Sequence, residues 1–120
     1  MRQELDDLLC QRYPDIFRDR HLSSQETRMC DGFCCGEGWF DLIDDLCADI
    51  TARVAAGDMP PVVATQVKSK TGYLRFYFKD RAANPQARLL IEEAKFLSEL
   101  TCEECGGFGL GCPGHRPVQS

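Results

Sequence analysis

The chain has 120 residues, of which 43% are hydrophobic and 28% charged, and its formal net charge at pH 7 is -5. This length allows one hydrophobic core, so we expect a single domain over residues 1–120. The composition excludes a disordered acidic tail, and no apolar run approaches the roughly 18 residues that a membrane-spanning helix needs. The first residues are acidic and show no signal peptide, so we expect a cytoplasmic protein without a membrane partner.

Two amphipathic helices are predicted in the first half of the chain. Residues 3–13 place leucines at helical spacing, with aspartates in the first turn where the helix dipole favours them, and Pro14 ends this helix. The second helix is the clearest, because apolar residues recur every three or four positions while aspartates fill the other side. Gly57 is its expected left-handed stop. Its apolar positions are Trp39, Leu42, Ile43, Leu46, Cys47, Ile50 and Val54, and its acidic positions are Asp41, Asp44, Asp45 and Asp49.

An antiparallel β-hairpin is predicted next. Residues 62–68 are rich in β-branched side chains, residues 73–78 alternate between apolar and polar, and residues 69–72 form the turn. A two-stranded hairpin is marginally stable alone, so we expect its apolar face to lie against the helices. That face consists of Leu74, Phe76 and Phe78.

A third helix is predicted after the hairpin. It begins at Asn84, an N-cap that is followed by proline at the first helical position. The sequence therefore predicts an α+β fold of three main helices and one antiparallel hairpin. The buried stripe expected for the third helix runs through Ala87, Leu90, Ile91, Ala94 and Leu97 to Leu100.

The third helix leads into two pairs of ligands with the spacing of a zinc site, Cys102 with Cys105 and Cys112 with His115. Surrounding glycines let the backbone bend closely around an ion. We therefore predict one structural zinc ion in a zinc knuckle over residues 101–115, where four protein ligands leave no open position for catalysis. The gap between the pairs is shorter than the roughly 12-residue spacer of a DNA-reading finger. The alternative is a set of free thiols near the chain end.

The other cysteines leave more readings open. The chain has eight cysteines in all, and the reducing cytoplasm favours metal ligands or thiols, whereas an exported protein would favour disulfides. Cys30 and Cys35 are candidates for a second metal, completed by His21 or Cys47, or for structural thiols. A third reading pairs Cys35 with His21 as nucleophile and base, but no orienting group or oxyanion site is evident nearby.

A basic strip lies between two acidic parts of the chain. Residues 59–88 carry one acidic residue, Asp80. Their basic residues are Lys68, Lys70, Arg75, Lys79, Arg81 and Arg88. On the hairpin, aromatic side chains alternate with cations, a combination that can stack bases and neutralise phosphates. The alternative is a solvated sheet face, just as the aspartates at 41–49 are typical of a solvated helix face. The candidate ligand-binding residues are Lys68, Lys70, Tyr73, Arg75 and Tyr77.

Three blocks of the sequence, residues 35–43, 66–77 and 101–106, resemble a family of small uncharacterised proteins encoded by tailed phages and prophages. The resemblance spans roughly residues 5 to 115. It implies Cys30 and Cys35 as the structural pair, because the family is similar there but lacks a thiol at position 34. It also implies a longer loop between the two ligand pairs, which this chain has shortened to residues 106–111.

The resemblance transfers no activity, but it implies a phage product acting in the bacterial host cytoplasm. We therefore expect a non-enzymatic, zinc-stabilised accessory protein that binds and inhibits a host factor such as a defence system, through the basic hairpin, the acidic helix or both. The alternative is a nucleotide or single-stranded nucleic-acid binder that uses the basic aromatic hairpin. A third class is a thiol enzyme centred on Cys35.

Overall fold

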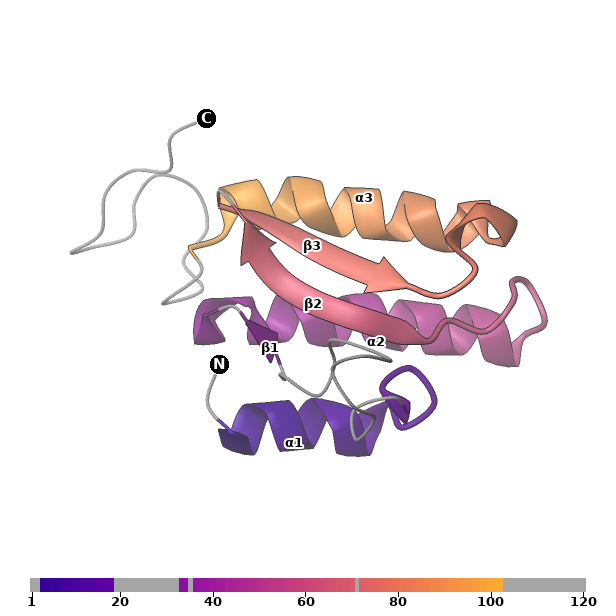
Figure 1. The fold of residues 1–120 in the computed structure, drawn as a ribbon, viewed down its shortest axis with the longest axis horizontal. Helices are drawn as coiled ribbons and strands as arrows, with labels where there is room; N and C mark the ends of the chain where they lie inside the picture. The colour runs from indigo at the N-terminus through magenta and orange to yellow at the C-terminus, as the bar shows by residue number, and fades with distance from the viewer. Residues whose placement is uncertain (1–2, 19–32, 35, 71, 103–120) are drawn as a thin grey trace.

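The computed structural model describes residues 3–18, 33–34, 36–70 and 72–102, and these form an α+β fold (Figure 1). Three helices accompany one small sheet, as the sequence predicts. Two short 3-10 helices, η3 (Glu37–Trp39) and η4 (Arg81–Ala83), precede the second and third helices. The main elements are α1 (Gln3–Arg12), β1 (Phe33–Cys34), α2 (Phe40–Ala55), β2 (Ala64–Lys70), β3 (Tyr73–Phe78) and α3 (Pro85–Leu100).

The predicted antiparallel hairpin is confirmed as β2 and β3. β3 has the predicted bounds, whereas β2 begins two residues later and ends two residues closer to the turn than expected. Lys70 pairs with Tyr73, which leaves a two-residue connection. The second residue of that connection, Gly72, has a φ of 85°, a conformation that glycine adopts without steric cost. The sequence did not predict β1, which adds to β2 in parallel and makes the sheet three-stranded in the order β1-β2-β3. Two residues are too short for a recognisable alternation.

The core lies between the sheet and the helices. Leu74, Phe76 and Phe78 are 1%, 5% and 7% exposed, so the inward face of the hairpin is confirmed. They join one cluster with Leu9 of α1 and with the buried positions of α2 and α3. Figure 1 shows α3 running beside β3, α2 running along β2, and α1 at the opposite edge of the molecule. None of the helices in the described ranges is long and apolar enough to cross a membrane.

The ends of α2 and α3 follow their sequence signals. Gly57, just beyond α2, has a φ of 79° and provides the expected left-handed stop. Asn84 caps α3, because its side-chain oxygen accepts a hydrogen bond from the backbone N–H of Ala87 at 3.2 Å. Its side-chain nitrogen donates to the carbonyl of Pro60 at 3.0 Å, so the same residue fixes α3 against the segment before β2.

One predicted core position on α3 is wrong. Leu97 is 41% exposed, and the neighbouring Ser98 is buried instead. The hydroxyl of Ser98 accepts a hydrogen bond from the backbone N–H of Leu74 at 2.9 Å. A small hydroxyl therefore replaces a large apolar side chain where α3 comes close to the edge of β3.

Candidate functional site

The outer face of the hairpin holds all five predicted ligand-binding residues, which we call the basic sheet face: Lys68, Lys70, Tyr73, Arg75 and Tyr77. Alternation along β3 turns its polar side chains away from the core, since side chains of a strand point to opposite faces in turn. The strand register then places Lys68 opposite Arg75 and Lys70 opposite Tyr73. The structure therefore brings these residues onto one surface, as the sequence predicts.

Two lysines lie over the tyrosine rings of this face. The Nζ atom of Lys68 is 5.8 Å from the ring centroid of Tyr77, and that of Lys95 is 5.6 Å from the centroid of Tyr73. Each contact is worth about 0.5–1 kcal/mol at an exposed site, enough to bias a lysine's position but weak enough for a ligand to replace. Lys95 belongs to α3 and was not among the predicted residues.

A small groove between β3 and α3 adjoins the basic sheet face. Four cationic side chains line it, against one carboxylate, that of Glu92. Positions 88, 92 and 95 follow helical spacing, so α3 presents them along one row toward β3. The sequence reasoning missed three of these cations, because nothing local indicates that α3 lies beside β3. The four cationic residues are Arg75, Arg81, Arg88 and Lys95.

The guanidinium of Arg75 has an unusual environment. Its Nε atom is buried and has no hydrogen-bond partner within the part of the chain that the structure describes. Within that same part, Arg75, Arg81 and Arg88 form no ion pair. Buried polar atoms normally have partners, so an orphaned guanidinium nitrogen indicates a place where an additional acceptor would be stabilised.

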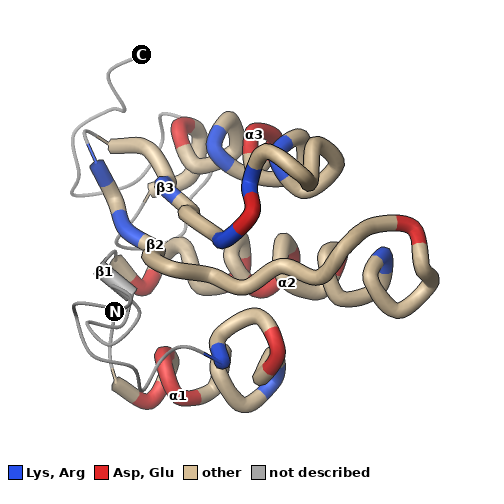
Figure 2. Tube along the Cα trace, turned by 45° about the vertical axis from the view of Figure 1, so that its right-hand side comes forward, with Lys and Arg blue, Asp and Glu red and all other residues tan. Residues whose placement is uncertain are grey.

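The charges of the described residues separate in space. Figure 2 shows lysine and arginine on β2 and β3, acidic residues mainly on α1 and α2, and residues of both signs on α3. On α2, Asp41, Asp45 and Asp49 are exposed and spaced four residues apart, which places them in one row. The formal charge of -5 therefore conceals a basic hairpin and an acidic row on α2.

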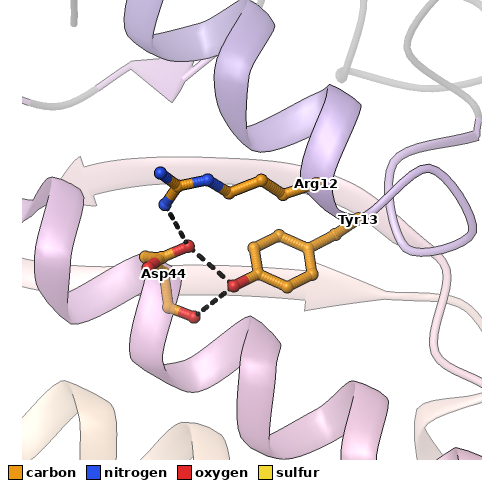
Figure 3. A network of polar contacts seen from close by, with 3 residues as sticks. All are labelled: Arg12, Tyr13 and Asp44. Atoms are coloured by element: carbon orange, nitrogen blue, oxygen red, sulfur yellow. Dashed lines mark hydrogen bonds and ion pairs between the residues drawn. The ribbon is translucent and has the colours of Figure 1, made fainter.

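Asp44, by contrast, is not a solvated residue as the sequence pattern indicated. Its carboxylate forms an ion pair with Arg12 at 3.0 Å and accepts a hydrogen bond from the Tyr13 hydroxyl at 2.6 Å (Figure 3). Tyr13 also donates to the backbone carbonyl of Asp44 at 3.0 Å. Burial and the adjacent carboxylate raise the pKa of Tyr13 to about 12. This cluster holds α1 against α2.

A cavity of about 350 Å³ lies beside this cluster. Its walls are mainly apolar and include Ile16, Ile50, Val54 and Val62. The polar groups of Arg12 and Tyr13 at this cavity are already engaged with Asp44. The cavity therefore offers less specific chemistry than the basic face.

The predicted metal ligands are only partly placed. Cys102 follows α3 and is half-buried, whereas Cys105, Cys112 and His115 lie outside the described residues, as do Cys30 and Cys35. No group of three or more potential metal ligands occurs within the described ranges. The zinc knuckle and the second metal site thus stay predictions.

Cys47, a candidate for completing the second metal site, is fully buried in the hydrophobic core. Burial, with smaller contributions from Asp44 and Cys10, raises the pKa of its thiol. A thiol that resists ionisation packs as a small apolar side chain, which agrees with the apolar helix position predicted for Cys47.

No family model matches the sequence, and comparisons with curated proteins and with solved structures found no match. Fold and site alone therefore define the class: a small α+β protein with a basic face on its sheet.

Proposed function

We propose that this chain is a non-enzymatic binding protein that holds a nucleotide or a short single-stranded nucleic acid on its basic sheet face. The observation that carries the proposal is the pairing of Lys68 with Arg75 across the hairpin, beside Tyr77. On the basic sheet face, cationic side chains and aromatic rings occupy adjacent positions. Proteins that bind single strands without sequence preference combine these two features.

The spacing along β3 suits an extended polymer. Residues 73, 75 and 77 share one face and are separated by about 7 Å per step, since a strand rises about 3.4 Å per residue. Successive phosphates of an extended strand can then meet successive side chains. A base that stacks on Tyr73 or Tyr77 replaces a lysine ammonium, which is then available to a phosphate.

The net negative charge does not oppose this function. At physiological ionic strength, charges more than about 8 Å apart across solvent are largely screened. The acidic residues of α1 and the acidic row of α2 lie on a different part of the molecule from the basic sheet face (Figure 2). Local charge therefore governs which ligands approach the sheet.

Fluorescence anisotropy with a labelled oligonucleotide of about eight residues tests the proposal. For three phosphate contacts, raising salt from about 50 to about 200 mM weakens binding roughly 20-fold, because each contact on a single strand contributes about -0.7 to the logarithmic salt slope. The R75Q variant loses most of the affinity. R53Q is the matched control, since Arg53 is on α2 and pairs with Asp49. Absence of binding at low salt would overturn the proposal.

A second candidate function is that of a phage-type accessory protein that binds and inhibits a host protein. The exposed row of Asp41, Asp45 and Asp49 on α2 favours it, because such a row complements a basic partner surface. Affinity capture from host lysate, with zinc measured on the same sample, identifies partners. The candidate fails if no captured protein binds the purified chain. Loss of binding in D41K/D45K assigns the contact to the acidic row, whereas loss in R75Q alone assigns it to the basic sheet face.

A further inference from the structure

The groove between β3 and α3 concentrates more positive charge than the apolar cavity beside Arg12 and Tyr13 does. Arg75, Arg81, Arg88 and Lys95 line it, and Glu92 is the one acid among the described lining residues. The formal charge of the lining side chains is therefore +3. A ligand carrying two negative charges fits this balance better than a single carboxylate does.

Two arginines of this groove have side chains open to a ligand. Arg81 and Arg88 are exposed, and neither forms an ion pair within the described residues. The Nε atom of Arg75 is buried and lacks an acceptor in that part of the chain. Arginine presents a planar fork of donors that matches the oxygens of a phosphate group.

The size of the groove restricts the ligand further. Its volume is about 50 Å³, against about 350 Å³ for the apolar cavity beside Arg12 and Tyr13. A small oxyanion matches a groove of this size better than a nucleobase does. Leu74, Phe76, Phe78 and Ile91 also line the groove, and an apolar lining strengthens charge interactions by lowering the local dielectric.

The groove is continuous with the basic sheet face, because Arg75 and Tyr77 belong to both. From this continuity we infer that the groove between β3 and α3 binds the terminal phosphate monoester of a nucleotide or oligonucleotide whose remainder lies on the sheet. The inference rests on the proposed function and names the group that the ligand must carry. Arg75 and Arg88, from β3 and α3, hold the phosphate from two sides.

A labelled trinucleotide with and without a 5′-phosphate tests this pocket. The 5′-phosphate raises affinity about tenfold or more, as expected for charge-assisted hydrogen bonds from arginine. R88Q removes this gain without affecting the unphosphorylated trinucleotide. K70Q is the matched control, because Lys70 belongs to the basic sheet face but not to the groove, and it weakens both ligands equally. Inorganic phosphate competes with the phosphorylated ligand more than chloride of equal ionic strength does.

The outcomes separate the pocket from the proposed function. Equal binding of the two trinucleotides, with no specific effect of R88Q, overturns the pocket and leaves the proposed function standing. If neither trinucleotide binds, the proposed function fails, and melting in the presence of inorganic phosphate then tests whether the groove binds a phosphate group. A higher melting temperature in phosphate than in chloride of equal ionic strength, absent in R88Q, then supports it. Equal melting temperatures overturn it.

Discussion

The contact between α1 and α2 depends on Asp44, and replacing Asp44 by asparagine measures how much. The isosteric amide removes the charge that meets Arg12 and Tyr13 while leaving the backbone carbonyl of Asp44 as an acceptor. A hydrogen bond to a charged group contributes about 1.5–3 kcal/mol, against about 0.5–1.5 kcal/mol for a neutral pair. The ion pair adds less than about 1 kcal/mol, because the Arg12 side chain is 44% exposed.

D44N should therefore lower the free energy of unfolding by about 1–2.5 kcal/mol, from the sum of these two losses. In urea this corresponds to a midpoint lower by roughly 1 M, for the slope typical of small proteins. D49N is the matched control on the same helix. Asp49 pairs with Arg53 one turn away, both side chains being nearly half exposed, so its loss costs about 0.3–0.5 kcal/mol.

Urea unfolding followed by circular dichroism gives both values, and a double-mutant cycle with Y13F assigns the coupling. The Tyr13 and Asp44 substitutions should be non-additive by about 1 kcal/mol, since the two side chains share a hydrogen bond. If D44N costs no more than D49N, or if the cycle is additive, the cluster in Figure 3 does not stabilise the contact between the helices.

Three further predictions concern Tyr13, Ser98 and the predicted zinc knuckle. Burial and Asp44 raise the pKa of Tyr13 to about 12 from 10.0. Tyr13 therefore loses its proton at lower pH in the unfolded chain than in the folded protein, and the free energy of unfolding should fall as pH rises from 10 to 12. In the ultraviolet titration of the folded protein, one tyrosine should ionise late, and Y13F should remove that step. S98A leaves the buried N–H of Leu74 without its acceptor and should cost about 1–2 kcal/mol in urea unfolding, whereas T101A, which loses only an exposed hydroxyl contact, should cost less than about 0.5 kcal/mol. The predicted zinc knuckle requires about one zinc per chain by mass spectrometry, and chelation or C105S should lower the melting temperature; less than about half an equivalent, with melting unchanged, would rule it out.

Several elements follow directly from local pattern. The alternation from Tyr73 to Phe78 determines which face of β3 is apolar, and burial of Leu74, Phe76 and Phe78 confirms it. The cap at Asn84 and the stop at Gly57 depend on one residue each and its immediate neighbours, so both are confirmed. The five residues of the basic sheet face share a surface for the same reason, since alternation needs no tertiary information.

Other features depend on contacts between distant segments. Helical periodicity extends the buried stripe of α3 to Leu97, yet Ser98 takes the inward position because α3 approaches β3 closely and the N–H of Leu74 needs an acceptor. Asp44 resembles its exposed neighbours in sequence, but the position of α1 engages it with Arg12 and Tyr13. Periodicity reports which side of a helix faces inward and not what lies there.

The sequence alone determined the α+β class, the hairpin and the basic sheet face, because these follow from periods of two and about 3.6 residues and from single capping positions. Only the tertiary structure decided that β1 joins the sheet and that Arg81, Arg88 and Lys95 meet Arg75 in one groove. That meeting depends on how α3 lies beside β3, a contact set by packing of the whole core. The cations of α3 therefore belong to the candidate binding site only because the fold places them next to the basic sheet face.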